Sequence, residues 1–323
     1  MSTLVSGVRA CPVREWQASQ RAMRELLAPH GLRLGINPLG WTNDVITEFG
    51  DDTSAETFIG EAAAVGYEGV EMGRKFPTDR QALARMLAAG NVDLVSGWYS
   101  GQLAEISVAE ELANVANHAA LLAHNGARVM VYGETGLMPG DAPLDKPLSA
   151  TPVVADTEWA AYGQRLTEFG EALQRDYCIQ LAYHAHLMMV AESEAEIDRL
   201  MAATGEAVGL LLDTGHIVAG GGDMARVLAN HGHRINHIHL KDIRPEIFAG
   251  IRKRDASFNT GVRSGMFTVP GDGAIDYAPV IDFATSDAYT GWLVVEAEQD
   301  PTQACPREYA DKAIRHVRSL FNG

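Results

Sequence analysis

The chain has 323 residues and a formal net charge of −16, with a sequence pI near 5.1. This excess of negative charge argues against nucleic acid as a partner, because nothing would neutralise phosphates over an extended surface. Its three cysteines are too few and too widely spaced for a disulfide framework, and no apolar run reaches about 20 residues. We therefore expect a reduced, cytoplasmic protein that does not enter a membrane.

The chain begins with a helical pattern around residues 17–27, followed by eight short apolar runs of strand length. The runs are 34–37 (LGIN), 69–72 (GVEM), 92–98 (VDLVSGW), 128–133 (RVMVYG), 179–184 (IQLAYH), 208–213 (VGLLLD), 235–240 (INHIHL) and 292–298 (WLVVEAE). We therefore predict a helical N-terminal extension over residues 1–32 and a single domain over residues 33–323.

Helical segments separate the eight runs, and this alternation is typical of a parallel sheet covered by helices. Helix starts are indicated where a Ser or Thr precedes a Glu by three residues: Thr53 and Glu56, Ser107 and Glu110, Ser193 and Glu196. Eight strand–helix units predict closure into a (β/α)8 TIM barrel, which takes about 250 residues. An open doubly wound sheet is the alternative, although no GxGxxG follows the first strand.

Two connections are longer than the others. The first contains MPGDAPLDKPLSATP (138–152), before a helix predicted to begin near Asp156. The second runs from residue 243 to about residue 290 and includes MFTVPGDGAIDY. Both follow strands, so they should lie at the C-terminal face of the barrel, where long loops commonly shape an active site.

Ionisable side chains gather at the ends of the last four strands. They are His184, His186, Asp213, His216, His237, His239, Lys241, Asp242, Glu296 and Glu298. Because side chains alternate along a strand, His184 and His186 share one face, as do His237, His239 and Lys241. Imidazole and carboxylate ligands from neighbouring strands suit a divalent cation such as Mn²⁺, Co²⁺, Zn²⁺ or Fe²⁺. We therefore predict a metal site.

Other strand ends carry polar or aromatic groups that could bind a polyhydroxylated substrate. Among these candidates are Asn37, Glu71, Arg74, Lys75, Trp98 and Glu134. Arg74 and Lys75 could equally be solvated charges of a loop.

Several motifs together resemble a known superfamily. The order LDTGH (212–216), HIHLKD (237–242), VPGDGAIDY (269–277) and GWLVVEAEQD (291–300) resembles the xylose-isomerase-like barrels. Within that superfamily, GINPLGWTND (35–44), EMGRKFP (71–77), LVSGWYSG (94–101) and VMVYGETG (129–136) are similar to the myo-inosose-2 dehydratase family. The resemblance runs from about Leu34 to the end of the chain.

The resemblance implies a metal held by the ends of strands five to eight. By position the ligands are His184, Asp213, His239 and Glu296; many relatives place Glu at the first position, whereas inosose dehydratases have His there. One segment departs from that family, whose pattern is YHHHMGT where this chain reads YHAHLMM (183–189). We expect Ala185 to point away from the site, and Met188 and Met189 to reshape the wall that contacts substrate.

The implied reaction is loss of water from 2-keto-myo-inositol (scyllo-inosose) to give a trihydroxycyclohexane-1,2-dione, with Mn²⁺ or Co²⁺ as cofactor. Metal bound to the ketone would stabilise the enediolate, with Glu296 or His184 as base. His216, His186 or Lys241 would supply the acid or bind the oxyanion. The alternatives are an isomerase or epimerase that uses the same enediolate, and a non-catalytic polyol-binding barrel. The sequence is also compatible with association into a homo-oligomer.

Overall fold

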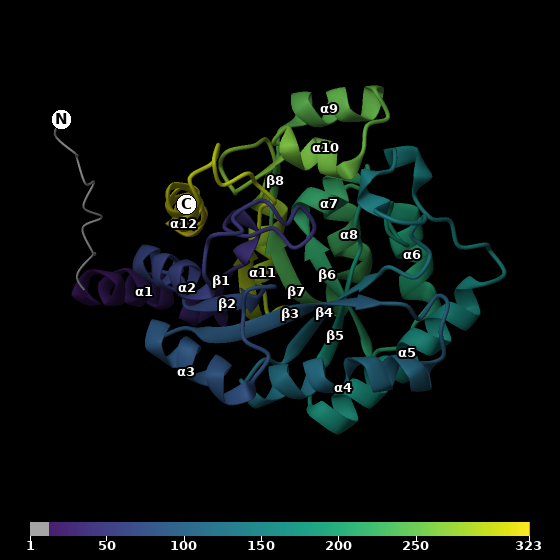
Figure 1. The fold of residues 1–323 in the computed structure, drawn as a ribbon, viewed down its shortest axis with the longest axis horizontal. Helices are drawn as coiled ribbons and strands as arrows, with labels where there is room; N and C mark the ends of the chain where they lie inside the picture. The colour runs from purple at the N-terminus through teal and green to yellow at the C-terminus, as the bar shows by residue number, and fades with distance from the viewer. Residues whose placement is uncertain (1–12, 323) are drawn as a thin grey trace.

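The computed structural model describes residues 13–322. In this part of the chain eight parallel strands close into a barrel (Figure 1), in the order β1, β10, β7, β6, β5, β4, β3, β2. The strands are β1 (Leu32–Ile36), β2 (Gly69–Met72), β3 (Asp93–Gly101), β4 (Val129–Glu134), β5 (Gln180–His184), β6 (Val208–Asp213), β7 (Ile235–Leu240) and β10 (Gly291–Val295). The closed barrel confirms the predicted fold and excludes an open doubly wound sheet.

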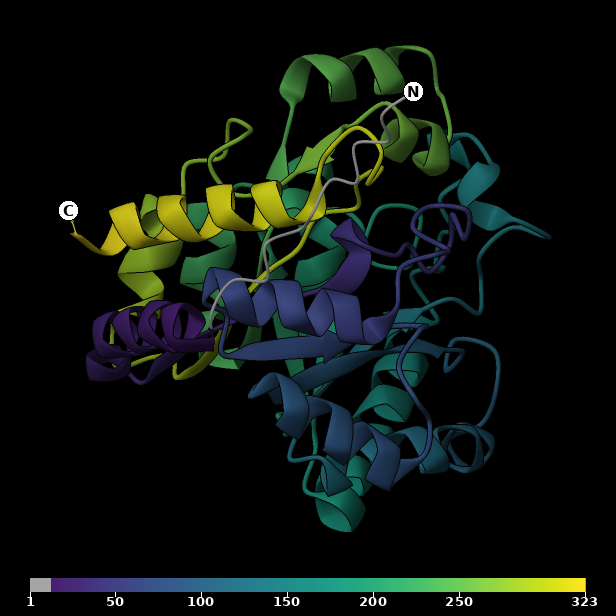
Figure 2. The ribbon, with the colours of Figure 1, turned by 60° about the vertical axis from the view of Figure 1, so that its left-hand side comes forward.

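Helices follow the strands and cover the outside of the barrel (Figures 1 and 2). They are α2 (Ala55–Val65), α3 (Arg80–Gly90), α4 (Val108–His124), α5 (Trp159–Tyr177), α6 (Glu194–Ala203), α8 (Met224–His231), α11 (Ala278–Ala284) and α12 (Pro306–Asn322). The main hydrophobic core fills the layer between these helices and the strands. None of the helices within residues 13–322 is both long and apolar enough to cross a lipid bilayer.

The predicted helix starts were right in two of three cases. Ser107 and Ser193 form complete capping boxes at the starts of α4 and α6. The prediction at Thr53 was wrong by one residue, because the side chain of Ser54 accepts the hydrogen bond from the backbone N–H of Thr57. Helix α5 begins at Trp159, slightly later than predicted.

The N-terminal helix α1 (Val13–Leu27) and the short 3-10 helix η1 (Ala28–His30) precede β1. They confirm the helix predicted at residues 17–27, whereas residues 1–12 of the predicted extension lie outside the described residues. The amide of Gln20 donates to the carbonyl of Tyr67 (2.7 Å), just ahead of β2. Helix α1 therefore lies at the N-terminal end of the barrel, away from the predicted site.

The two long connections meet above the C-terminal face. The first contains the 3-10 helices η3 (Pro143–Asp145) and η4 (Leu148–Ala150). The second contains α9 (Pro245–Lys253), α10 (Phe258–Arg263) and the short antiparallel pair β8 (Asp242–Ile243) and β9 (Phe267–Thr268). The amide of Asn259 donates to Asp145 (2.8 Å), which ties α10 to η3. A second hydrophobic cluster, which includes Leu144, Met188, Phe258 and Val262, packs between these loops.

Asp242 organises the second connection. Its carboxylate accepts hydrogen bonds from the backbone N–H groups of Ile243, Gly271, Gly273 and Ile275, at 2.9 to 3.1 Å. A β-carbon at position 273 would lie only 2.2 Å from Oδ1 of Asp242, so this close approach requires glycine. Asp242 therefore has a structural task in the loop rather than a place in the metal site.

Candidate metal centre

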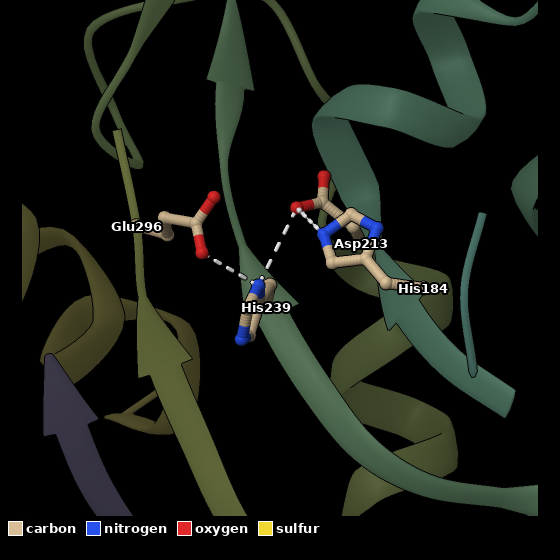
Figure 3. Close-up of side chains that lie close together, drawn as sticks. All are labelled: His184, Asp213, His239 and Glu296. Carbon is tan, nitrogen blue, oxygen red and sulfur yellow. Dashed lines mark ion pairs between the residues drawn. The ribbon is translucent and has the colours of Figure 1, made fainter. Parts of the chain in front are cut away.

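Four side chains from neighbouring strands meet at the C-terminal end of the barrel (Figure 3). His184 ends β5, Asp213 ends β6, His239 lies on β7, and Glu296 directly follows β10. One ligand atom from each of the four lies within 4.8 Å of the others, and all four residues are buried. The structure thus brings together the four residues that the sequence suggested as metal ligands.

Two of these ligand atoms are buried without a hydrogen-bond partner among residues 13–322: Oδ2 of Asp213 and Nδ1 of His239. Oδ2 of Asp213 lies 3.4 Å from Nε2 of His184 and 3.6 Å from Nδ1 of His239. Nδ1 of His239 lies 2.7 Å from Oε2 of Glu296, but not in a direction suited to a hydrogen bond. Buried polar atoms are nearly always paired, and a cation among these atoms would satisfy them. The donor set therefore fits a divalent metal ion.

The tautomers of both histidines suit metal binding. Nδ1 of His184 lies 2.9 Å from the carbonyl of Ala185, which can only accept, so Nδ1 carries the proton and Nε2 presents its lone pair to Asp213. Nε2 of His239 lies 3.1 Å from Oε1 of Glu71, which leaves Nδ1 free for the metal. A hydrogen bond to the second ring nitrogen is the usual way in which proteins orient a metal-binding histidine.

Glu71 on β2 is the partner that orients His239 from across the barrel. Its Oε1 also accepts from Nε2 of His237 (2.8 Å) and from the hydroxyl of Ser96 (2.5 Å), and its Oε2 accepts from the amide of Asn37 (2.7 Å). Burial alone would raise the pKa of Glu71, but the imidazoles of His239 and His237 outweigh it and hold that pKa well below its usual range. The sequence offered only the position of Glu71 at a strand end, without its partners.

A cavity of about 570 Å³ opens above three of the four candidate ligands, His184, His239 and Glu296. Its floor includes His184, His186, His239, Glu296 and Glu298. Its upper wall is largely apolar and is formed by residues of the long loops, among them Met138, Leu144, Met189, Phe258 and Val262. The cavity therefore has room for a small cyclic substrate over the metal position.

A second group of side chains, His186, His216 and Glu298, adjoins the first. The rings of His186 and His216 lie 3.7 Å apart, centroid to centroid, and Nε2 of each is about 4 Å from Oε1 of Glu298 (4.0 and 3.9 Å). Burial, with the neighbouring imidazole of His184 and the ammonium group of Lys241, lowers the pKa of His186 to about 3. Burial and His186 also hold the pKa of His216 well below its usual value. Both imidazoles are therefore neutral at pH 7.

The hydrogen bonds of His216 decide which of its nitrogens carries the proton. Its Nδ1 accepts from the backbone N–H of Leu187 (3.2 Å), so Nε2 carries the proton in the neutral ring.

His216 and Lys241 are both buried and lie beneath the cavity rather than along it. Burial alone would lower the pKa of Lys241, but the carboxylates of Asp213, Glu296 and Glu298 raise it above its usual value.

The predicted substrate-binding residues fall into two groups. Asn37, Trp98 and His186 line the cavity, although both polar ends of Asn37 are occupied, by Glu71 and by the backbone N–H of Leu39. Lys75 is not brought to the cavity, because its ammonium group binds the carbonyl and the carboxylate of Asp51.

Glu134 is also kept from the cavity. It is fully buried and accepts hydrogen bonds from Tyr132 (2.8 Å), Gly136 (2.8 Å) and Ala104 (3.1 Å). Burial raises the pKa of its carboxyl group to about 7, despite these three donors.

The segment 183–189, which departs from the family pattern, contributes His184, His186 and Met189 to the cavity lining. Ala185 packs in the main core, on the side of β5 away from the ligands. Met188 adopts a φ of 68°, a conformation that favours glycine, and its side chain packs in the upper hydrophobic cluster. Met189 lines the cavity. Met189 therefore forms part of the upper wall, as expected, whereas Met188 packs behind it and does not line the cavity.

A closed barrel with buried imidazoles and carboxylates at its C-terminal face has the architecture of a metal-dependent enzyme. Residues 59–320 match the family model described as xylose isomerase-like TIM barrel, and the chain belongs to this family.

Its relatives include proteins named as dehydratases. The chain is 39% identical to an inosose dehydratase of Geobacillus thermodenitrificans, over 89% of this chain and 96% of the relative. It is 42% identical to the rhizopine catabolism protein MocC of Rhizobium meliloti, over 86% of this chain and 85% of that one. The chain is thus an enzyme similar to inosose dehydratases.

Solved structures share the fold at much lower sequence identity. The IolI protein with a bound zinc atom has a TM-score of 0.64 at 14% identity, covering 90% of this chain and 98% of that one. The probable 3-DHS dehydratase AsbF of Bacillus anthracis has a TM-score of 0.62 at 15% identity, covering 88% and 98%. These structures support the barrel architecture alone.

Proposed function

We propose that the protein removes water from 2-keto-myo-inositol to give a trihydroxycyclohexane-1,2-dione. The observation that carries the proposal is the buried set of His184, Asp213, His239 and Glu296, three of which, His184, His239 and Glu296, line the cavity. Relatives named inosose dehydratases, at 37 to 39% identity over about nine-tenths of the chain, support this substrate.

The metal would be held by Nε2 of His184, Nδ1 of His239 and the carboxylates of Asp213 and Glu296. Two imidazoles and two carboxylates suit a divalent ion of intermediate softness, and we propose Mn²⁺ or Co²⁺. When bound, such an ion supplies a Lewis acid that stabilises negative charge on the oxygen of a ketone. We also propose, from the few and widely spaced cysteines of the sequence, that the enzyme works in the cytoplasm.

We propose Glu298 as the base, in place of the predicted Glu296 and His184. His184 and Glu296 direct their lone pairs at the metal position, and a carboxylate that binds metal is a weak base. Glu298 lines the cavity without belonging to the ligand set, and burial raises its pKa. A carboxylate of raised pKa is better suited to abstract a proton at neutral pH.

Glu298 would act twice in the elimination. Its carboxylate takes the proton from the carbon next to the ketone, and the resulting carboxylic acid gives that proton to the departing β-hydroxyl group, which leaves as water. The neutral His186 has its Nδ1 proton bound to the carbonyl of Leu187 (2.6 Å), so its Nε2 is free to accept a hydrogen bond from a substrate hydroxyl.

The test is to strip the purified protein with a chelator, restore Mn²⁺ or Co²⁺ separately, and follow 2-keto-myo-inositol by NMR. We expect the dione only after metal is restored. Turnover that is unchanged after treatment with the chelator contradicts the metal-dependent reaction. In D₂O, deuterium exchange into the ketone without loss of water would instead identify an isomerase or epimerase.

A further inference from the structure

The ammonium group of Lys241 is enclosed by carboxylates. Its Nζ lies 2.6 Å from Oε1 of Glu296, 3.0 Å from Oε2 of Glu298 and 3.4 Å from Oδ2 of Asp213. The ring of Phe267 closes a further side, with its centroid 4.9 Å from Nζ. The side chain is fully buried. This is the environment of a bound cation, with oxygen atoms on several sides and no access to bulk water.

The motif at the end of β6 holds the stem of Lys241 in place. The hydroxyl of Thr214 donates to the carbonyl of Lys241 (2.5 Å) and accepts from its N–H (2.9 Å). A β-carbon at Gly215 would lie 2.7 Å from Cγ of Lys241, so the glycine leaves the space through which the stem passes. Asp213 then meets the ammonium group. Three consecutive residues of the DTGH motif therefore fix the position of one lysine.

This position is next to the candidate metal centre but is separate from the substrate cavity. Glu296 connects the two: its Oε2 faces His239 in the ligand set, while its Oε1 faces Lys241. A carboxylate shared in this way between two positive charges is the arrangement of a two-metal site, in which the ions lie about 4 Å apart. Lys241 does not line the cavity, so its ammonium group does not contact the substrate.

The position of Nζ gives the same result, because it faces one oxygen atom each of Asp213, Glu296 and Glu298, as a bound cation would. We propose that Lys241 occupies the position of a second divalent cation, and thereby limits the centre to one metal ion per chain. The inference rests on the metal centre of the proposed function, but not on its substrate.

The consequence is that a chain without this ammonium group should accept a second ion. The oxygen atoms that now face Nζ, from Glu296, Glu298 and Asp213, would become its ligands, and carboxylate oxygens suit Mn²⁺. We expect the full-length wild-type protein, saturated with Mn²⁺ and freed of unbound metal by gel filtration, to hold one Mn²⁺ per chain by mass spectrometry. Its electron paramagnetic resonance spectrum should be that of isolated Mn²⁺.

Lys241→Ala should double the metal content to two Mn²⁺ per chain, with a spectrum that shows coupling between neighbouring ions. The double variant Lys241→Ala/Glu298→Ala should return to one, because it removes a ligand of the second ion together with the lysine. Lys253→Ala, which removes a lysine of the exposed part of α9, is the matched control and should also hold one. If circular dichroism shows that Lys241→Ala does not fold, Lys241→Gln is measured with the same expectation.

Two Mn²⁺ per wild-type chain would overturn the proposal, as would a single uncoupled ion in the folded Lys241→Ala or Lys241→Gln variant. A second ion that persists in the double variant would show binding elsewhere and would equally overturn it. A wild-type chain that holds one Mn²⁺ but leaves 2-keto-myo-inositol unchanged contradicts the proposed function and supports the limit of one ion.

Discussion

Oε1 of Glu71 lies 3.1 Å from Nε2 of His239, on the opposite side of the barrel, and 2.8 Å from Nε2 of His237. One carboxylate therefore holds two imidazoles of β7 and fixes which nitrogen of His239 faces the metal position. We predict that Glu71→Gln weakens Mn²⁺ binding about 10- to 100-fold, since an amide cannot accept from all these donors. Competition with a fluorescent chelator measures the affinity.

The matched control for this prediction is Glu61→Gln. Glu61 also accepts a hydrogen bond from an aromatic N–H, that of Trp41 (2.6 Å), but it lies outside the candidate metal centre. Its variant should bind Mn²⁺ like the wild type. Equal affinities for wild type and Glu71→Gln would show that Glu71 does not orient the ligand.

Asp213 has two tasks that substitution can separate. Its Oδ2 belongs to the ligand set, and its Oδ1 accepts from the backbone N–H of His216 (2.8 Å), which caps α7 (Thr214–Ala219). We expect both Asp213→Asn and Asp213→Ala to lose bound metal, as counted by mass spectrometry. Asp213→Ala should be less stable than Asp213→Asn by about 1 kcal/mol, because only the amide keeps the cap. Urea unfolding in the presence of a chelator measures this difference, and full metal retention by either variant contradicts the ligand assignment.

Glu298→Gln should lower kcat for 2-keto-myo-inositol by about 100-fold or more, because the amide cannot shuttle a proton. Metal content should stay at the wild-type value, since Glu298 is not one of the four proposed ligands, His184, Asp213, His239 and Glu296. The comparison is Glu296→Gln, which should lose metal and activity together. Loss of metal from Glu298→Gln would instead identify Glu298 as a ligand, whereas an unchanged kcat would remove it from the reaction.

The raised pKa of Glu134 predicts a pH-dependent stability. The pKa is about 7 in the folded protein and close to the ordinary 4.5 in the unfolded chain, so the folded state binds the proton more tightly. This group's contribution to stability is therefore present below pH 4.5 and is lost as pH rises to 7, by about 3 kcal/mol in total. Urea unfolding at pH 5 and pH 8 should show a smaller loss in Glu134→Gln than in wild type. Equal losses would mean that Glu134 ionises normally.

The sequence was sufficient to predict the barrel and the group of ionisable residues at the strand ends, because both depend on local periodicity. Alternation along β7 places His237, His239 and Lys241 on one face, and the strand order follows from repeated strand–helix units. The resemblance then selected Asp213, His239 and Glu296 from a larger set of polar residues at strand ends.

Contacts across the barrel and within loops were beyond sequence reasoning. The pairing of Glu71 with His239 joins strands that are not neighbours, so no alternation pattern signals it. Glu71 lies on β2 and Lys75 follows that strand. The ammonium group of Lys75 nevertheless binds the carboxylate of Asp51, in the connection between β1 and α2. The positive φ of Met188 was also not predictable, because it depends on packing in the second hydrophobic cluster, which offsets the strain of that conformation.

The space that Gly215 leaves for the stem of Lys241 links two motifs that stand far apart in the chain. A larger residue at position 215 would collide with the lysine, and a shorter residue at position 241 would remove the need for glycine. Across related sequences the two positions should therefore change together, and a chain that has lost both would be the natural place to look for an enzyme of this family that works with a pair of metal ions.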